Sequence, residues 1–167
     1  MSGPGAIVFT DIVGFTRFTA SEGDTRAVQL LDTKRDIVDD LLPTGGRVVK
    51  ELGDGLLLWI DNADSSVRFC AALQIACRRA SEEGPFPLWV RIGAHWGEAA
   101  ERAGDLIGHE VNTAARIVDQ AGPGETLASD VLVKQCDPAA LDGEAVPIGP
   151  VLMKGLPAAV WLYRLTP

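Results

Sequence analysis

Residues 47–60, RVVKELGDGLLLWI, decide the fold, because they contain two short strand-forming runs separated by a tight turn. We expect strands over 47–51 and 55–60, with Gly53 and Asp54 as the two residues of the turn between them. A hairpin of this kind joins neighbouring antiparallel strands, so the central sheet is not wholly parallel.

Helix and strand patterns alternate on both sides of this hairpin. Strands are predicted over 6–9, 88–94, 125–128, 146–153 and 160–165, and helices over 14–20, 25–42, 64–83, 108–120 and 129–135. In the helix over 64–83 the residues expected to face inward are Val67, Cys70, Ala71, Ile75 and Ala76. Interleaved helices and strands with a central hairpin favour an α/β domain with a mixed sheet over a doubly wound parallel one.

Length and composition limit the class of protein. A chain of 167 residues predicts one domain, over 1–167. A net charge of −8 argues against a broadly basic surface for nucleic acid. No apolar run approaches the roughly 18 residues of a membrane helix, and we expect neither a signal peptide nor a membrane segment. The three cysteines lack metal-binding spacing, which favours a reducing compartment and a cytoplasmic location, with Cys70 and Cys77 buried on one helix face.

Two aspartates stand at the ends of predicted strands. Asp11 follows the strand over 6–9, and Asp54 lies at the tip of the hairpin. If the two strands are neighbours, both acids point to one edge of the sheet, where paired carboxylates can hold Mg²⁺ against a phosphate. The alternatives are a plain turn residue for Asp54 and a helix N-cap for Asp11.

Two further features concern anions. The helix start after Gly14 leaves backbone N–H groups free for an anion, although neither a P-loop nor a GxGxxG pattern is present. On the helix over 108–120, Asn112 and Arg116 are four residues apart and therefore share a face. Taken alone, such a pair is more often a solvated stripe than a binding site. Ala114 and Ala115 make the same helix narrow, which allows close packing.

Six motifs in order resemble the class III nucleotidyl cyclase catalytic domain. They are FTDIVGFT at 9–16, KELGDG at 50–55, RIGAH at 91–95, DLIG at 105–108, VNTAARI at 111–117 and KGL at 154–156. The resemblance covers nearly the whole chain. It implies an α+β fold with a ferredoxin-like βαββαβ core, whose mixed, mainly antiparallel sheet is flanked by helices.

The resemblance also implies a metal centre. Asp11 and Asp54 match the family's metal-binding aspartates, with the backbone of Ile12 as a further ligand and two Mg²⁺ or Mn²⁺ ions per site. Phe15 and Thr16, at the helix start, match positions that bind the substrate phosphates.

Four more residues match positions that handle the nucleotide. Asn112 is similar to the residue that orients the ribose, and Arg116 to the one that neutralises charge on the α-phosphoryl group. Lys154 and Arg91 resemble contacts to the terminal phosphates. The implied reaction is in-line attack of the ribose 3′-hydroxyl on the α-phosphorus.

Hydrogen-bonding capacity argues for adenine as the base. Lys50 can only donate, to adenine N1, and an ionised Asp105 can only accept, from the N6 amine. Guanine presents the opposite pattern, and guanylyl-type sites of this family carry an acid at the position of Lys50. We therefore expect an adenylyl cyclase that converts ATP to cyclic AMP and pyrophosphate.

In this family the site forms between two catalytic domains. The resemblance implies that one domain contributes Asp11, Asp54 and Arg91, and the other Lys50, Asp105, Asn112, Arg116 and Lys154. This chain carries both sets. We therefore expect a homodimer with two equivalent sites and an inactive monomer. The alternatives are a guanylyl or dual-specificity cyclase, and a cyclase-like module that binds nucleotide without turnover.

Overall fold

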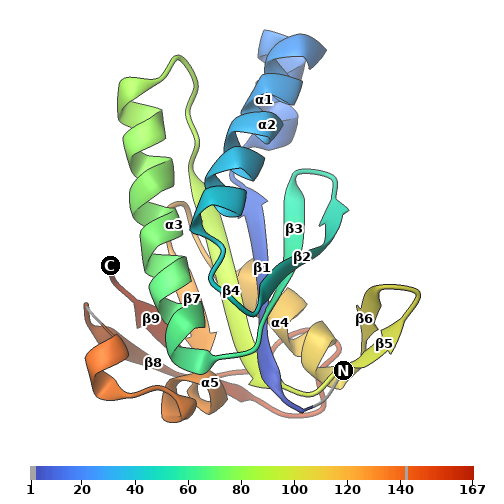
Figure 1. Cartoon of the computed structure of the whole chain (residues 1–167), viewed down its shortest axis with the longest axis vertical. Helices are drawn as coiled ribbons and strands as arrows, with labels where there is room; N and C mark the ends of the chain where they lie inside the picture. The colour runs from blue at the N-terminus through green and yellow to red at the C-terminus, as the bar shows by residue number, and fades with distance from the viewer. Residues whose placement is uncertain (1–2, 142) are drawn as a thin grey trace.

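The computed structural model of the chain describes residues 3–141 and 143–167 (Figure 1). The strands are β1 (Gly5–Ile12), β2 (Gly46–Leu52), β3 (Gly55–Ile60), β4 (Val90–Gly97), β5 (Ala100–Arg102), β6 (Asp105–Ile107), β7 (Thr126–Ser129), β8 (Ala145–Val151) and β9 (Val160–Leu165). The α-helices are α1 (Phe15–Glu22), α2 (Asp24–Leu41), α3 (Ala63–Glu83), α4 (His109–Gln120) and α5 (Asp130–Gln135), and a 3-10 turn covers Pro138–Ala140.

Seven strands form one sheet in the order β2-β3-β1-β4-β7-β9-β8. All neighbouring strands are antiparallel except β4 and β7, which are parallel. Strands β1 to β4 and the helices between them follow the βαββαβ order. The expected mixed, mainly antiparallel sheet flanked by helices is therefore confirmed, including the two-residue turn at which Leu52 pairs with Gly55.

Helices cover both faces of the sheet (Figure 1). Successive residues of a strand point to opposite faces, so neighbouring residues of β1 pack against different helices. Val8 of β1 lies in one apolar cluster with Leu30 of α2 and Leu73 of α3. Ile7 lies in a second cluster with Ala114 of α4. The continuous apolar run of β1 is explained by this two-sided burial.

Helix α4 lies very close to the sheet. Ala114 is completely buried, as its small side chain predicts, and an added Cβ at Gly93 of β4 would overlap the backbone of Val118. A third apolar cluster joins Ile117 of α4 to Leu127 and Leu162 of β7 and β9. This packing fixes the position of the helix that carries Asn112 and Arg116.

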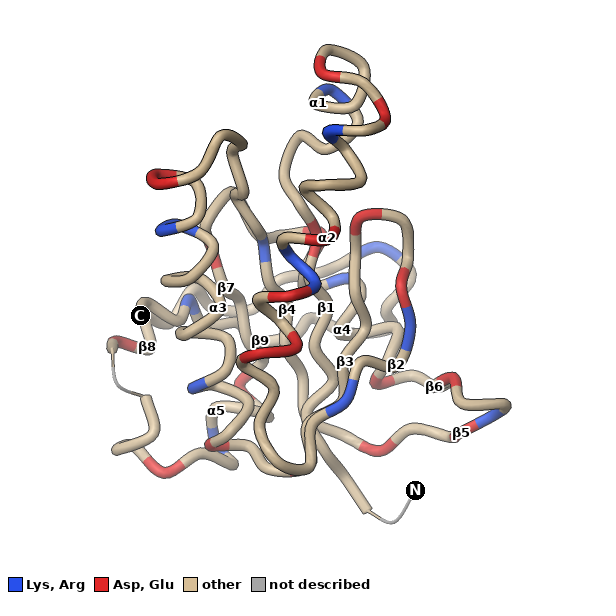
Figure 2. The backbone as a smooth tube through the Cα atoms, turned by 45° about the horizontal axis from the view of Figure 1, so that its top comes forward, with Lys and Arg blue, Asp and Glu red and all other residues tan. Residues whose placement is uncertain are grey.

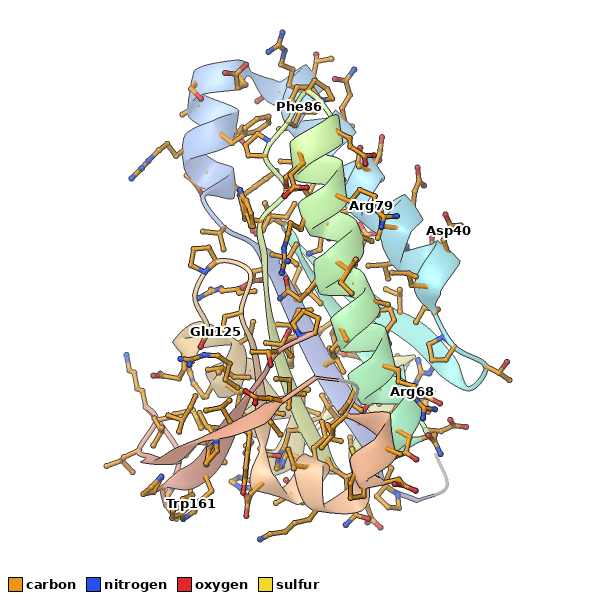
Figure 3. The ribbon with its side chains drawn as sticks, turned by 90° about the vertical axis from the view of Figure 1, so that its left-hand side faces the viewer. Asp40, Arg68, Arg79, Phe86, Glu125 and Trp161 are labelled. Atoms are coloured by element: carbon orange, nitrogen blue, oxygen red, sulfur yellow. The ribbon has the colours of Figure 1, made fainter. Side chains whose placement is uncertain are left out.

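One prediction about α3 is wrong. Ile75 was expected to face inward, but it is 44% exposed, whereas Gln74 is 3% exposed. The amide of Gln74 donates to the Val90 carbonyl (3.4 Å) and to Thr126 Oγ1 (3.2 Å), so paired hydrogen bonds make its burial tolerable. Cys70 and Cys77 are buried on the inner face as expected, and Arg68 and Arg79 project from the outer one (Figure 3).

The short hairpin of β5 and β6 was not predicted. It forms a separate two-stranded sheet beside β2, and its turn contains Ala103 (φ +50°) and Gly104 (φ +79°). Acidic and basic residues are interspersed over the whole chain, as Figure 2 shows. Among the helices of the described chain, none combines the length and apolar character that crossing a membrane requires.

Candidate active site

A cleft of about 580 Å³ lies where β1 ends, between the β2–β3 turn and the start of α1. All six residues expected to bind metal or phosphate on this side line it: Asp11, Ile12, Phe15, Thr16, Asp54 and Arg91. Arg17 also lines it, together with the loop residues Ala121 and Pro123. The six expected residues, up to 80 positions apart in the sequence, are thus gathered at one edge of the sheet.

Asp11 is positioned by the pairing of β1 with β4. Its register partner is Arg91, whose Nη2 and Nε donate to Asp11 Oδ2 at 2.8 and 3.2 Å. Asp11 is not the N-cap of α1, because Gly14 occupies that position with φ +73° and no side chain caps the helix. An added Cβ at Gly55 would lie 2.5 Å from Asp11 Oδ1, so the glycine keeps the space beside this carboxylate free.

Asp54 is positioned by the hairpin turn. Gly53 precedes it with φ +64°, a conformation that glycine adopts without strain. Asp54 Oδ2 accepts a hydrogen bond from the backbone N–H of Ile12 at 2.9 Å, which ties the turn to the end of β1. The acid is therefore more than a solvated turn residue.

This arrangement fits a hard divalent cation. Asp11 Oδ1 and Asp54 Oδ1 accept no hydrogen bond from the described residues, so each carboxylate keeps an oxygen for a ligand. Within residues 3–141 and 143–167, no three or more His, Cys, Asp or Glu side chains are arranged so that they could hold a metal ion by themselves. Two carboxylates and a backbone carbonyl suit Mg²⁺ or Mn²⁺, which complete their coordination with water and substrate phosphates.

Helix α1 points its N-terminal end at the same cleft. Its first residues, Phe15 and Thr16, line the cleft, and no acidic side chain lies in the first turn. Free N–H groups and the helix dipole favour an anion at such an end. The cleft therefore offers carboxylates for a cation beside a helix end and Arg91 for an anion.

Lys50 and Asp105 form an ion pair away from this cleft. Lys50 Nζ lies 2.7 Å from Asp105 Oδ2, and each side chain is 37% exposed. The backbone N–H of Leu106 donates to the other carboxylate oxygen at 2.7 Å. The hydrogen bond from Lys50 lowers the pKa of Asp105, which keeps the carboxylate ionised. The two residues expected to recognise adenine thus lie side by side, on β2 and β6.

The residues expected to act on ribose and phosphate from α4 are exposed. Asn112 and Arg116 lie on the outer face of the helix, and Arg116 Nη1 is 3.3 Å from Asp119 Oδ2. Asp119 Oδ1 is also 3.8 Å from Arg91 Nη2, so this acid lies between the two arginines. Lys154 is exposed in the turn between β8 and β9. Within one chain, Lys50, Asp105, Asn112, Arg116 and Lys154 do not line the cleft.

Sequence reasoning missed Lys34 of α2. This lysine is 2% exposed, and its Nζ donates to the backbone carbonyls of Asp54 (2.7 Å) and Thr10 (3.2 Å). Burial lowers its pKa to about 8, while Asp11 and Asp54 act in the opposite direction. The signal was present in the sequence, because position 34 lies four residues from Leu30 and from Val38 on the apolar face of the helix.

His95 has a structural role. It is 4% exposed, its Nδ1 lies 2.7 Å from Ser129 Oγ, and its Nε2 contacts the carboxylate of Glu110. Burial lowers the pKa of His95. The contacts join β4 to the start of α5 and to α4, on the far end of the sheet from Asp11.

The sequence and fold of the chain are similar to those of known nucleotide cyclases. The sequence model described as adenylate and guanylate cyclase catalytic domain matches residues 3–166. Putative adenylate cyclase 3 of Rhizobium meliloti (strain 1021) is 33% identical over 128 residues, 75% of this chain and 22% of that protein. An adenylate cyclase of Streptomyces coelicolor is 30% identical over 131 residues, 78% of this chain and 33% of that protein. The chain thus spans about a fifth to a third of these relatives.

Solved structures share the fold. The crystal structure of an adenylate/guanylate cyclase/hydrolase from Silicibacter pomeroyi has a TM-score of 0.80 at 25% identity, over 98% of this chain and 96% of that one. An adenylate cyclase from Trypanosoma brucei in its monomeric state has a TM-score of 0.84 at 20% identity, over 98% and 90% of the two chains.

Proposed function

Because the chain belongs to the class III nucleotidyl cyclase catalytic domain family, we propose that it converts ATP to 3′,5′-cyclic AMP and pyrophosphate. The observation that favours ATP over GTP as the substrate is the Lys50–Asp105 pair. Its donor, Lys50 Nζ, and its acceptor, Asp105 Oδ2, are 2.7 Å apart. Adenine N1 and N6 are also an adjacent acceptor and donor, so one base edge can contact both side chains. In the same orientation, guanine would present a donor to Lys50 and an acceptor to Asp105, and this mismatch would weaken its binding.

Asp11 and Asp54, with the backbone carbonyl of Ile12, would hold two Mg²⁺ or Mn²⁺ ions. Bound ions would lower the pKa of the ribose 3′-hydroxyl and neutralise charge on the triphosphate. Of the chain's own groups, Arg91 and the start of α1 bind the terminal phosphates, which the cleft geometry supports. Arg91 exchanges its contact with Asp11 for phosphate oxygens, which guanidinium binds equally well.

The remaining residues act on the part of the nucleotide that reacts. Asn112 orients the ribose, and Arg116 stabilises the negative charge that develops on the α-phosphoryl oxygens. Lys154 contacts the terminal phosphates. The exposure of Asn112, Arg116 and Lys154 supports roles toward a ligand, because the fold does not bury them.

The active form is a homodimer with shared sites. One set of residues lines the cleft, and the other set, on β2, β6, α4 and the β8–β9 turn, lies outside it. Two copies related by a twofold axis place the cleft of each against the second set of the other, which makes two equivalent sites.

The first experiment measures product from ATP and from GTP, with Mg²⁺ and with Mn²⁺, at several protein concentrations. Cyclic AMP from ATP is expected, with specific activity rising as the protein is concentrated. Formation of cyclic GMP from GTP in preference to cyclic AMP from ATP would favour the guanylyl alternative. A folded protein that makes neither product would favour a nucleotide-binding module.

Base recognition has its own test. Lys50→Glu combined with Asp105→Gly should lower kcat/KM for ATP relative to GTP by at least about 100-fold. Glu101→Gln, on the neighbouring β5, is the control and should leave the ratio unchanged. An unchanged ratio in the double variant would remove the basis for assigning adenine.

A further inference from the structure

The side chain of Lys34 lies beneath the two carboxylates of the cleft. It extends from α2 to the end of β1 and the β2–β3 turn, where its Nζ donates to the Thr10 and Asp54 carbonyls. At 2% exposure it is among the largest fully buried side chains of the protein. It does not line the cleft, and the proposed reaction does not use it.

The surroundings of Lys34 account for a buried positive charge. An isolated ammonium group is costly to bury unless it is hydrogen-bonded and balanced by opposite charge. Burial lowers the pKa of Lys34 to about 8, and the charges of Asp11 and Asp54 are the largest influences that raise it again. Two carbonyl acceptors and two nearby carboxylates thus give an ammonium group at this position both hydrogen bonds and opposite charge.

Two basic side chains, Arg91 and Lys34, accompany the carboxylate pair in the free chain. Asp11 faces Arg91 at 2.8 Å, and both Asp11 and Asp54 lie in the field of Lys34. Each carboxylate therefore has a basic neighbour, and Arg91 is shared with Asp119 at 3.8 Å. The cations differ in freedom, because the Arg91 side chain is 29% exposed in the open cleft, whereas Lys34 is enclosed and held by two hydrogen bonds.

We propose that Lys34 is the resident counter-cation of the Asp11–Asp54 pair, and that it makes a free divalent cation bind weakly until a triphosphate binds with it. The inference rests on the proposed metal and nucleotide site. Arg91 can turn toward an incoming ligand, but Lys34 cannot leave, so its repulsion acts on any cation at the pair. The negative charges of a triphosphate offset that repulsion, which couples metal binding to nucleotide binding.

The test measures equilibrium binding of Mn²⁺ to the full chain at pH 7 by electron paramagnetic resonance of free Mn²⁺. Lys34→Met removes the charge and the donor, whereas Lys34→Gln removes the charge and keeps a donor. Leu30→Ala is the matched control, since Leu30 is buried on the same face of α2 one turn earlier. Both Lys34 variants should bind Mn²⁺ alone at least about tenfold more tightly than wild type, and Leu30→Ala should bind as wild type does.

A second measurement does not depend on the variants folding. In wild type, α,β-methylene-ATP, which cannot release pyrophosphate, should tighten Mn²⁺ binding at least about tenfold after correction for the complex in solution.

Several outcomes would overturn the proposal. The proposal fails if the folded Lys34 variants bind Mn²⁺ no more tightly than wild type, or if only Lys34→Met does. It also fails if Leu30→Ala binds Mn²⁺ more tightly than wild type. A wild-type affinity for Mn²⁺ that is the same with and without the nucleotide analogue would contradict it as well. Failure of the proposed function is distinguishable, because it would appear as absent cyclic nucleotide or as Mn²⁺ binding that Asp54→Asn does not weaken.

Discussion

Asp11 and Asp54 reach the cleft by different routes, and each has its own support. Asp11 is placed by the antiparallel register that sets it opposite Arg91. Asp54 is placed by a two-residue turn whose acid accepts from Ile12 N–H. Because the supports are separate, a substitution at one acid leaves the other in position.

Asp54→Asn should abolish metal-dependent turnover without unfolding the chain. Asparagine keeps the size of the side chain and one oxygen for the Ile12 N–H, but it removes the charge that would bind a divalent ion. We expect cyclic AMP formation to fall at least about 100-fold, with a cooperative melting curve retained.

Asp61→Asn is the control for this change, since Asp61 is an exposed acid just after β3. Its activity should equal that of wild type. An Asp54→Asn enzyme with more than about half of wild-type activity would contradict the metal role assigned to Asp54.

The thiol of Cys136 should react in a way that reports its partial burial. Burial raises its pKa to about 11, and its Sγ donates to the Leu132 carbonyl at 3.3 Å. Because a raised pKa leaves less thiolate at a given pH, alkylation by iodoacetamide should rise about tenfold per pH unit up to pH 10. A thiol of ordinary pKa would level off near pH 9.

Mass spectrometry of the alkylated peptides measures the rate at each cysteine. Burial raises the pKa of Cys70 and of Cys77 to about 12, so both should be alkylated only after unfolding. A plateau for Cys136 below pH 9.5, in a protein that stays folded, would show that its thiol is not perturbed.

The β5–β6 hairpin is the smallest element with a direct bearing on the site. Its two strands have three residues each, yet β6 brings Asp105 to Lys50 on β2. Its turn has positive φ at both central residues, Ala103 and Gly104, which is the pattern of a type I′ turn. Alanine is strained in that conformation.

Ala103→Asn should therefore stabilise the fold. Asparagine adopts the left-handed conformation more readily, and Asn-Gly is the preferred pair for this turn. We expect the free energy of unfolding to rise by about 0.5–1 kcal/mol in urea denaturation. Ala158→Asn, at an exposed site without positive φ, should change it little. Equal effects at the two sites would show that the turn is not strained.

At the scale of the whole molecule, the two sets of site residues lie on different parts of the surface. The cleft set is formed by β1, the β2–β3 turn, α1 and β4, and the second set by β2, β6, α4 and the β8–β9 turn. One chain therefore holds every expected residue but does not bring the two sets to one point. This arrangement is the structural reason for proposing a shared site.

Mixing two inactive variants should restore activity. Asp11→Asn disables the cleft set, and Asn112→Ala, at an exposed position, disables the second set. Each variant alone should be inactive. Random pairing of equal amounts makes about half of the dimers mixed, each with one intact site, so about a quarter of wild-type activity should return.

The assay is cyclic AMP formation by the separate and the mixed proteins, with subunit exchange followed by mass spectrometry. Inactivity of the mixture although mixed dimers have formed would rule out sites shared in this way. Activity of either variant alone would show that its residue is dispensable.

The sequence by itself determined the order of the elements and the two acids of the cleft. Turn chemistry and hydrophobic periodicity are local, and they located the Gly53–Asp54 turn and the helices to within a few residues. The six cleft residues were found from three short motifs that match the cyclase family. Four of them, at positions 11, 12, 15 and 16, are neighbours in sequence, because the end of a strand adjoins the start of the next helix.

Only the tertiary structure decided which side chains are enclosed and which charges face each other. Lys34 meets Asp54 across 20 positions, Lys50 meets Asp105 across 55, and Arg91 meets Asp11 across 80. Hydrophobic periodicity predicted that Ile75 lies on the inner face of α3. In the structure Gln74 takes the inner face, where it bonds to β4 and β7, and Ile75 is exposed. The physical reason is that local patterns depend on spacing along the chain, whereas burial and ion pairing depend on how helices pack on the finished sheet.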